Sequence, residues 1–437
     1  MGGSLTQPER GILSAPAVAE IAPLRALHYD PAVAGAPPDL WAPPYDVIHA
    51  EQRAELVARS PYNVVRVDLP VGNDPYAEAA QEWRRWREAG AIVRDDEPAI
   101  WVLEQAYAGP DGRELTRTGF LCRVRVQDYG AGRIRPHERT HPGPKEDRLR
   151  LTRATQVNLS PIFALFSDPE ERAARALAPA TAGAPPSGEV TDEDGTRHRL
   201  WRIADPAVLD EVVAAVAAAE LLIADGHHRY ETARVYAEEV GTEDARWVLM
   251  CLVALEDPGL TVFPTHRLVS GTTPEAQEAL ATAIRRDWDI EPVAEDDLVP
   301  APSGDGRVRI GYLDSHVKRS FRLTLKEPAI ADRALADHAA PYRALDTAVT
   351  EALLLKGALK LTDDDIDHLH HFGYARDLVS AKTLLHDGTY DCGFFMGPVP
   401  VPRIQAVAAA GESMPPKSTY FFPKILTGMV FNPLSDS

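Results

Sequence analysis

The chain has 437 residues, of which 45% are hydrophobic and 25% are charged, a composition typical of a folded protein with two or three domains. Its formal net charge of −19 argues against a partner held through a phosphate backbone, because nonspecific nucleic-acid affinity needs clustered lysine and arginine. Nucleic acid is therefore not an expected partner.

Cysteine spacing and hydropathy indicate the cellular compartment in which the protein is expected. Cys122, Cys251 and Cys392 are isolated from one another, which favours a reducing environment and core packing over disulfides. No run reaches the ~18 apolar residues of a membrane span, and the N-terminus has no cationic region followed by an apolar core. We expect a cytoplasmic protein without a membrane span; one sequence does not indicate its oligomeric state.

Strands and helices are predicted to interleave along the chain. In order, the pattern predicts a hairpin over 101–126, a helix over 145–159, a strand over 161–166, a surface linker over 176–195, a helix over 206–220, a strand over 221–224 that turns into a helix, strands over 246–256 and over 261–269 with a break at Pro264, a hairpin over 308–325, a helix over 346–360 and an extended segment over 390–397.

This order predicts a mixed α/β or α+β fold, since strands and helices alternate without a regular βαβ count. Composition suggests three regions. They are 20–190, an α+β region; 191–300, built around the strand and helix that flank Asp225; and 301–437, a second α+β region.

Residues 223–232, IADGHHRYET, place polar and small residues where a strand turns into a helix. His227 and His228 are adjacent, so on a helix they diverge by about 100° and are poorly placed to share a metal ion. Gly226 and the helix N-terminus instead favour an anion, which the His227, His228 and Arg229 side chains would clamp. Asp225 is either a helix cap or the acceptor of a hydroxyl proton.

Two further segments carry candidate phosphate ligands. PHERTHPGPKEDRLR, 136–150, combines the carboxylate of Glu138 with the cations of Lys145 and Arg148, and Lys145 precedes the next lysine by more than 170 residues. GESMPPKSTYFFPKILTG, 411–428, offers Lys417, Ser418 and Thr419, without the spaced glycines of a P-loop. A solvated loop and a docking tail are the alternative readings of these two segments.

Two weaker candidates remain. Tyr45 and Asp46, after two prolines, are either a substrate wall or a structural turn. DDDIDHLHH, 363–371, has metal-ligand spacing but equally suits a hydrated helix face, and no zinc is expected. A serine-hydrolase triad is not indicated, because G-x-S-x-G is absent.

Six motifs in order resemble a bacterial and archaeal family known as domain of unknown function ten-fifteen. They are PPYDVI at 43, HERT with KEDR at 137–148, NLSPIF at 158, IADGHHRYETA at 223, LDTAV at 345 and MPPKSTYFFPKILTG at 414. The chain departs from the pattern at Glu351, where a histidine is expected, so a role for that helix in the site is in doubt.

The DGHHR segment also looks like the strand-turn-helix element of the ParB/sulfiredoxin-like superfamily, which includes free L-serine kinases. That resemblance implies a core of this fold and a nucleotide-phosphate site. It implies that Asp225 is the general base and that His227, His228 and Arg229 hold the transferring phosphate. Glu138 would be a second acidic group that orients substrate or Mg²⁺.

The sequence hypothesis is therefore phosphoryl transfer, with ATP or ADP and Mg²⁺, to or from a small hydroxy amino acid such as L-serine. The donor, the acceptor and the direction stay open. The alternative is a ParB-like nucleotide-binding regulator, which the charge of −19 disfavours. Sulfiredoxin-type thiol chemistry is a remote third hypothesis, since Gly226 precedes His227 where a cysteine would be needed nearby.

Overall fold

The structure, a computed structural model, describes residues 18–435 apart from 110–111, 132, 139–141 and 302–304. It forms two compact units. The first comprises the described parts of 1–135, 140–260 and 423–437, and the second comprises those of 136–139 and 261–422. Both contain strands and helices, so the mixed α/β fold class is confirmed. The division into three regions and the ParB-like core stay predictions.

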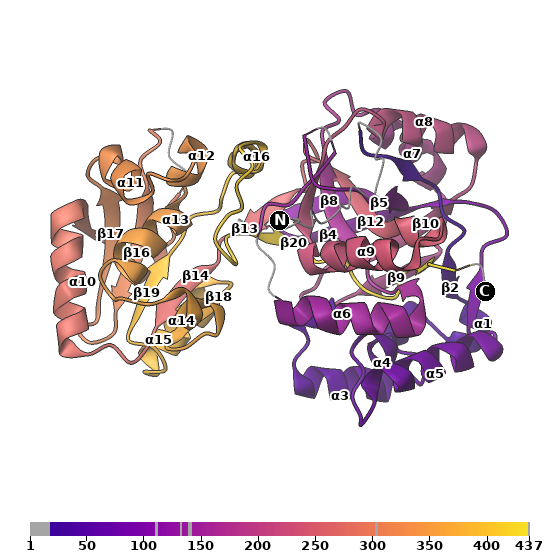
Figure 1. The fold of residues 1–437 in the computed structure, drawn as a ribbon, viewed down its shortest axis with the longest axis horizontal. Helices are drawn as coiled ribbons and strands as arrows, with labels where there is room; N and C mark the ends of the chain where they lie inside the picture. Colours follow the sequence, from indigo (N-terminus) through magenta and orange to yellow (C-terminus); the bar gives the residue numbers. More distant parts are fainter. Residues whose placement is uncertain (1–17, 110–111, 132, 139–141, 302–304, 436–437) are drawn as a thin grey trace, which may run out of the picture. The chain divides into compact units, whose positions relative to one another are not determined.

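The first unit is built on a nine-stranded sheet (Figure 1). The strands lie in the order β6 (Ile134–Arg135), β11 (Leu221–Asp225), β8 (Ile162–Phe166), β12 (Trp247–Ala254), β5 (Glu114–Arg125), β4 (Ile100–Ala108), β10 (Arg197–Ile203) and β9 (Gly188–Thr191), with β1 (Ile21–Ala22) also paired to β5. The pairs β6–β11 and β8–β12 are parallel and the other neighbours are antiparallel. Strands β8, β11 and β12 are apolar and buried along nearly their whole length, as strands covered on both faces should be.

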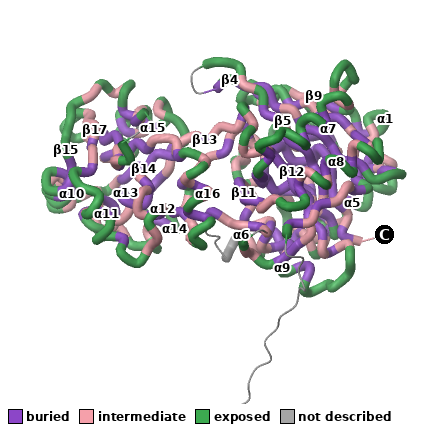
Figure 2. The backbone as a smooth tube through the Cα atoms, turned by 90° about the horizontal axis from the view of Figure 1, so that it is seen from above, coloured by how far each residue is buried: buried purple, intermediate pink, exposed green. Residues whose placement is uncertain are grey.

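Helices with apolar stripes cover this sheet. The longer ones are α3 (Ala50–Arg59), α5 (Pro75–Glu88), α6 (Pro142–Thr155), α7 (Arg172–Thr181), α8 (Pro206–Val216) and α9 (His227–Val240), and short turns form α1 (Pro31–Ala34), α2 (Pro37–Leu40) and α4 (Val65–Asp68). Side chains of α7, α8 and α9 share one buried cluster with alternate residues of β4, β5, β8, β11 and β12. Helix α6 packs on α9, and α5 packs on α6. Burial is densest along the central strands (Figure 2).

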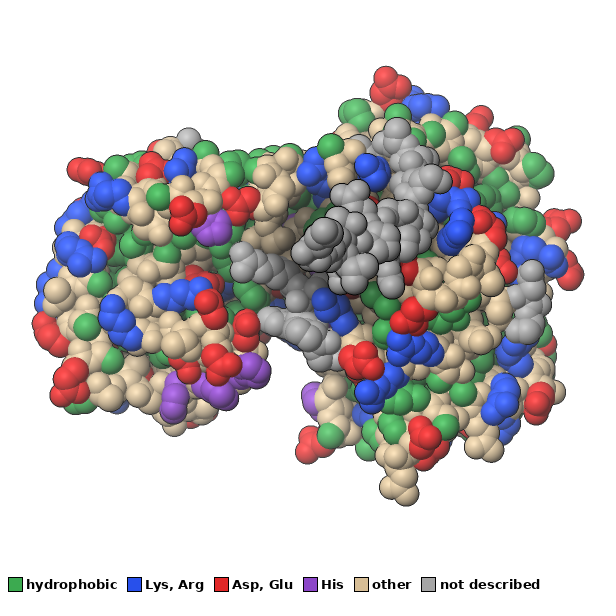
Figure 3. Space-filling model, in the orientation of Figure 1, with side chains coloured by type: hydrophobic (Ala, Val, Ile, Leu, Met, Phe, Trp, Pro, Cys, Tyr) green, Lys and Arg blue, Asp and Glu red, His purple; other side chains and the backbone are tan. Residues whose placement is uncertain are grey.

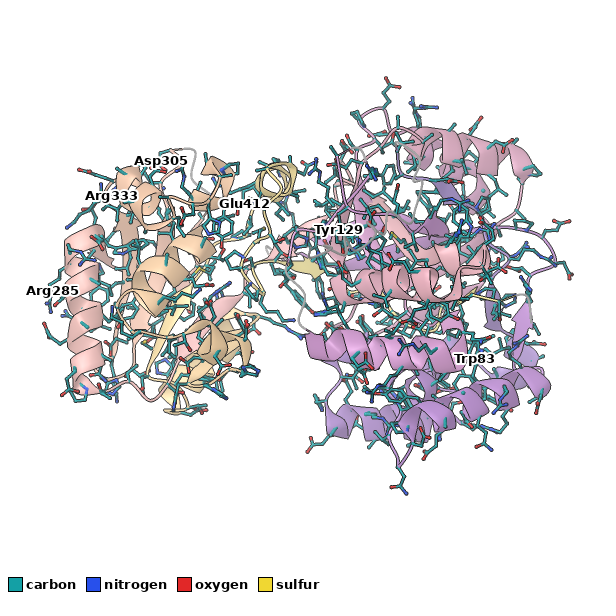
Figure 4. All side chains as sticks on the ribbon, viewed as in Figure 1. Trp83, Tyr129, Arg285, Asp305, Arg333 and Glu412 are labelled. Atoms are coloured by element: carbon teal, nitrogen blue, oxygen red, sulfur yellow. The ribbon has the colours of Figure 1, made fainter. Side chains whose placement is uncertain are left out.

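The C-terminal segment is part of the first unit. Its strand β21 (Asn432–Pro433) pairs with β7 (Val157–Asn158), and its Phe431 is fully buried. Phe431 packs edge-on against Trp83 of α5, which is labelled in Figure 4, at 5.0 Å between ring centroids. A two-stranded pair, β2 (Leu27–Tyr29) with β3 (Ile92–Arg94), adjoins it through the Leu27–Phe431 bridge.

The second unit has a six-stranded antiparallel sheet. Its strands lie in the order β15 (Trp288–Pro292), β17 (Arg319–Leu325), β16 (Arg309–Asp314), β19 (Cys392–Phe395), β14 (His266–Val269) and β18 (Phe372–Ala375), and β13 (Thr261–Phe263) pairs separately with β20 (Tyr420–Phe422). Its helices are α10 (Pro274–Asp287), α11 (Pro328–Ala334), α12 (Ala340–Arg343), α13 (Asp346–Thr350), α14 (Asp363–Asp367), α15 (Leu378–His386) and α16 (Val401–Ala409). Their leucine and alanine stripes pack on the sheet, as in the cluster around Leu268, Leu385 and Phe395.

Most predicted elements form, with one clear difference. The segment 176–195, expected to be a linker, contains the end of α7 and all of β9, which pairs with β10. Alanine-rich sequence is a good helix former, and α7 tolerates Pro179 near its end. Among the described residues, no helix is both long and apolar enough to cross a membrane.

Candidate functional site

The turn between β11 and α9 places Asp225 at the end of a buried strand. Gly226 links the two elements with a φ of 93°, a left-handed conformation that glycine adopts without steric cost. A Cβ on Gly226 would lie 3.0 Å from Cζ of Arg229, so glycine also leaves room for that guanidinium. The N-cap residue of the 14-residue helix α9 is Gly226, which has no side chain of its own to cap the helix. Its first-turn N–H groups and dipole therefore favour an anion beside the turn.

Asp225 forms ion pairs through both carboxylate oxygens. Oδ1 accepts a hydrogen bond from Nζ of Lys424 at 2.9 Å, and Oδ2 accepts one from Nη2 of Arg229 at 2.9 Å. Burial raises the pKa of Asp225, but Lys424 and Arg229 outweigh it, so the pKa is held well below its usual range. Asp225 is thus ionised at neutral pH, and both of its oxygens face cations.

Arg229 is held by three acceptors. Besides Asp225, its Nη1 donates to Oγ of Ser160 at 2.8 Å and to the carbonyl oxygen of Pro161. Ser160 Oγ lies 2.9 Å from Oγ1 of Thr427. The guanidinium therefore ties the DGHHR turn to the NLSPIF motif and, through Ser160, to Thr427 of the C-terminal segment.

The two histidines occupy different environments. His227 is buried in the first turn of α9, and His228 is half-buried. The electrostatic effect of His227 also lowers the pKa of Asp225, after the larger effects of Lys424 and Arg229. His227 therefore lies within electrostatic reach of the carboxylate.

A small cavity lies against Arg229. It has a volume of about 40 Å³, and its lining includes Tyr45, Asp68, Arg148, Ser160 and Arg229. That space suits one or two water molecules and is too small for a nucleotide. The fold thus places the predicted site residues Tyr45 and Arg148 beside Arg229. There they line a cavity that is large enough only for water.

Arg148 is buried on α6 and already paired. Its Nη1 donates to Oδ1 of Asp68 at 3.2 Å and to the carbonyl oxygen of Asp68 at 2.7 Å, and its guanidinium lies 4.1 Å from the ring centroid of Tyr45. Burial raises the pKa of Tyr45 to about 12, so it is a neutral phenol at pH 7. Asp46 lies beside Tyr45 in a short 3-10 turn, Tyr45–Val47, and Lys145 lies half-buried near the start of α6.

The other candidates form a cluster within the second unit. Oε1 of Glu138 accepts a hydrogen bond from the backbone N–H of Lys417 at 2.5 Å, and Lys417 has a φ of 54°. Ser418 Oγ donates to the carbonyl oxygen of Pro415 at 2.6 Å and lies 3.2 Å from Thr347 Oγ1. His137 Nε2 lies 2.8 Å from Thr419 Oγ1. Glu138 thus caps the MPPKST turn, while Arg139 and Thr140 of its motif lie outside the described residues.

The predicted metal spacing in 363–371 does not form a cage. Oδ1 of Asp364 lies 3.0 Å from Nδ1 of His368, and both side chains are more than 60% exposed. Within the described ranges, no group of three or more His, Cys, Asp or Glu residues is arranged to hold a metal ion. Glu351, at the position where a histidine was expected, pairs with Lys356 Nζ at 2.6 Å in a π-helical turn.

The family comparison covers most of the chain. Residues 21–348 match the model described as "Protein of unknown function (DUF1015)". The chain belongs to this family. The resemblance to domain of unknown function ten-fifteen is thereby confirmed. No curated protein matches this DUF1015 member.

Solved structures give distant matches to this DUF1015 member. They include a conserved hypothetical protein from Pyrococcus furiosus, at 15% identity and a TM-score of 0.34 over 67% of this chain and 88% of that one. A mutant free serine kinase in complex with ADP matches at 13% identity and a TM-score of 0.35, over 66% and 83%. SbnI with a C-terminal truncation, from Staphylococcus aureus, matches at 14% identity and 0.36, over 72% and 87%.

Sequence reasoning missed three residues that complete the first-unit site. Lys424, Asp68 and Ser160 contact Asp225, Arg148 and Arg229 respectively, from segments far along the chain. Lys424 and Ser160 stand inside motifs quoted above. The scarcity of lysine was the available signal for Lys424, since the chain has only eight.

Proposed function

We propose that this protein transfers a phosphoryl group between a nucleotide, ATP or ADP, and a small hydroxy amino acid, with free L-serine as the first substrate to test. The observation that carries the proposal is Asp225, an ionised carboxylate between Lys424 and Arg229 directly before the N-terminus of α9. Phosphoryl transfer requires an anion cradle, cations and one carboxylate near the acceptor hydroxyl, and this turn combines all three.

In the proposed reaction, the serine hydroxyl oxygen attacks the terminal phosphorus while the bond to the nucleotide oxygen breaks. The hydroxyl proton passes to Asp225. The first-turn N–H groups of α9 with His227 and His228 hold the phosphoryl oxygens. The arriving phosphate shares the Lys424 ammonium with Asp225, which raises the pKa of Asp225 toward the range in which a carboxylate accepts a proton effectively.

The remaining sequence-predicted residues keep their roles as proposals. Gly226 and Arg229 shape the cradle, and Tyr45, Asp46, Lys145 and Arg148 belong to the same unit. Glu138, Lys417, Ser418 and Thr419 stay candidate ligands on the second unit. Because the described residues contain no ready metal cage, Mg²⁺ is proposed to enter bound to the nucleotide phosphates.

A specific observation favours the second candidate, a nucleotide-binding regulator without kinase activity. The resting pKa of Asp225 is low, which suits a carboxylate that anchors cations better than one that accepts a proton. For a ParB-like DNA partner the support is weaker, because acidic and basic side chains are interspersed on the face seen in Figure 3. A gel shift with duplex DNA at low salt tests that partner.

The deciding experiment is ³¹P NMR of the protein with Mg²⁺, L-serine and ATP or ADP, and of the reverse mixture with O-phosphoserine. We expect a serine-dependent phosphomonoester signal, or loss of phosphoserine. Asp225→Asn should reduce turnover at least about 100-fold while nucleotide still binds. Asp210→Asn, an exposed position on α8, is the matched control and should behave as the natural protein. Undiminished transfer by Asp225→Asn would refute the base assignment, and nucleotide binding without transfer would favour the regulator.

A further inference from the structure

Lys424 carries the ammonium on Asp225 but lies in no helix or strand. A lysine side chain has four rotatable bonds, so its ammonium keeps a defined position only if the main chain that carries it is fixed. The main-chain carbonyl groups of Pro423 and Lys424 both accept hydrogen bonds from side chains. The carbonyl oxygen of Pro423 accepts a hydrogen bond from Nη2 of Arg117 at 2.5 Å, and that of Lys424 accepts one from Nε2 of Gln105 at 2.9 Å.

The donors belong to a row of buried polar residues on three neighbouring strands. His198 of β10 is directly opposite Gln105 of β4, and Gln105 is directly opposite Arg117 of β5. All three are at most 1% exposed. Directly opposed side chains on one face of a sheet are close enough to interact, so the register itself assembles the row.

The hydrogen bonds of the row have one consistent direction. Arg117 Nε donates to Oε1 of Gln105 at 3.1 Å, which orients the amide so that its Nε2 is the donor. That NH₂ group faces the carbonyl of Lys424 and Nδ1 of His198, at 3.2 Å. His198 then carries its proton on Nε2 and donates it to Oδ2 of Asp192 at 2.8 Å. Each member thus fixes the orientation of the next.

Burying the guanidinium of Arg117 is unfavourable in itself, and burial lowers its pKa to about 10. It lies 4.6 Å from the ring centroid of Phe163, a favourable cation-π distance. A neutral side chain of similar volume would fill this part of the sheet without the desolvation cost. What a neutral side chain would not provide is a strong, charge-assisted donor to the carbonyl of Pro423.

We infer that Arg117, Gln105, His198 and Asp192 form a positioning relay that fixes the main chain at Pro423–Lys424 and so holds the Lys424 ammonium on Asp225. None of the four contacts Asp225 in the interactions described, so they are positioning residues and Lys424 is the group that they serve. The relay's importance for turnover rests on the proposed function, but its effect on Lys424 does not.

The test measures Lys424 directly. The protein is reductively methylated under mild conditions and the modification rate of each of the eight lysines is followed by mass spectrometry. Exposed Lys318 is the internal reference. In the natural protein Lys424, which is 15% exposed on its side chain and ion-paired, should react slowly. Gln105→Met, which removes both the donor and the acceptor, should raise its rate about tenfold relative to Lys318.

Two further variants separate positioning from general destabilisation. Gln127→Met removes another fully buried glutamine, whose side chain does not bond to Lys424, and should leave the rate ratio unchanged. Arg117→Lys keeps a cation and should recover part of the protection that Arg117→Met loses. If Gln105→Met does not fold, the comparison of Arg117→Lys with the natural protein still gives the rate ratio, with an expected rise of two- to fivefold.

The outcomes distinguish this inference from the proposed function. An unchanged Lys424 rate in folded Gln105→Met or Arg117→Lys overturns the relay, whatever the activity. An increased Lys424 rate in a protein that transfers no phosphoryl group supports the relay and removes only its link to catalysis. If transfer is present, Gln105→Met should lower kcat about tenfold or more with little change in KM for the amino acid, whereas Gln127→Met should alter neither.

Discussion

The carboxylate of Asp225 depends on two neighbouring cations for its ionised state. Burial alone would raise its pKa, and Lys424 with Arg229 reverse that effect. Because the folded-state pKa lies below the unfolded value of 3.8, the ionised group stabilises the fold above that pH. This contribution is lost as the pH falls below 3.8 toward the folded-state pKa.

Removing Lys424 tests this dependence. Lys424→Met leaves Asp225 with Arg229 alone, so the pKa of Asp225 rises, and the free energy of unfolding at pH 7 should fall by about 2–3 kcal/mol. The deficit should shrink as the pH falls toward and below 3.8, because Asp225 of the variant, with its raised pKa, is protonated first and a protonated carboxyl group does not need the ammonium. Chemical denaturation at several pH values measures it. Arg59→Met, which breaks an exposed pair with Glu193, is the control and should cost no more than about 1 kcal/mol. A Lys424→Met deficit that is independent of pH would contradict the coupling.

At the scale of single residues, the sequence identifies candidate residues but not the partners of their side chains. Asp225, Gly226, His227 and Arg229 are recognisable because they are adjacent and follow a strand. The Lys424–Asp225 pair joins residues 199 positions apart, and no local pattern records such a separation. The roles of Arg148 and Glu138 were also not readable from the sequence. Their charges in a loop-like segment do not reveal that Arg148 pairs with buried Asp68, or that Glu138 caps the turn at Lys417.

Helix α9 begins and ends at glycines with positive φ, 93° at Gly226 and 71° at Gly241. The two ends differ in their surroundings. A Cβ at Gly226 meets the guanidinium of Arg229, whereas one at Gly241 meets no described atom within 4 Å. The N-terminal glycine is therefore needed for the site as well as for the backbone.

Alanine substitutions at these two positions separate backbone strain from damage to the site. Each should lower stability by about 1–2 kcal/mol, the penalty for placing a side chain in the left-handed region. Only Gly226→Ala should also weaken nucleotide binding, by about tenfold, because it displaces Arg229 from Asp225. Thermal unfolding measures the loss of stability, and calorimetric titration with ADP measures the change in nucleotide affinity. Equal effects of both substitutions on ADP affinity would show that the turn is not a phosphate cradle.

Element prediction succeeded where periodicity was strong. The strand and helix around Asp225, the break at Pro264 and the hairpin over 308–325 all occur as expected. The segment 176–195 was misread because its alanine, proline and glycine suggested a linker, whereas β9 forms by pairing with β10 across a turn. The π-helical turn Glu351–Lys356 inside a leucine-rich helix also leaves no trace in a 3.6-residue pattern.

At the scale of the whole molecule, the chain leaves the first unit at residue 260 and returns to it at 423. The returning segment supplies Lys424 to Asp225, Phe431 to the contact with Trp83, and β21 to the pair with β7. Sequence order alone suggested three successive regions, because composition does not reveal a segment that rejoins an earlier unit.

This topology predicts that the first unit needs the C-terminal segment more than it needs residues 261–422. A chain ending at residue 422 loses the fully buried Phe431, whose replacement by alanine alone would cost about 3–5 kcal/mol, together with the partners of β7 and Asp225. We expect the first unit of that chain to unfold at a much lower denaturant concentration, or not to fold. A chain in which a flexible Gly/Ser linker replaces 261–422 keeps these contacts and should retain a cooperative unfolding transition. Its Lys424 should remain protected from methylation relative to a single lysine placed in the linker as an exposed reference. Folding of the 422-residue chain with an intact first unit would show that the returning segment is not needed. Failure of the linker variant to fold would show that the contacts of the returning segment are not sufficient without residues 261–422.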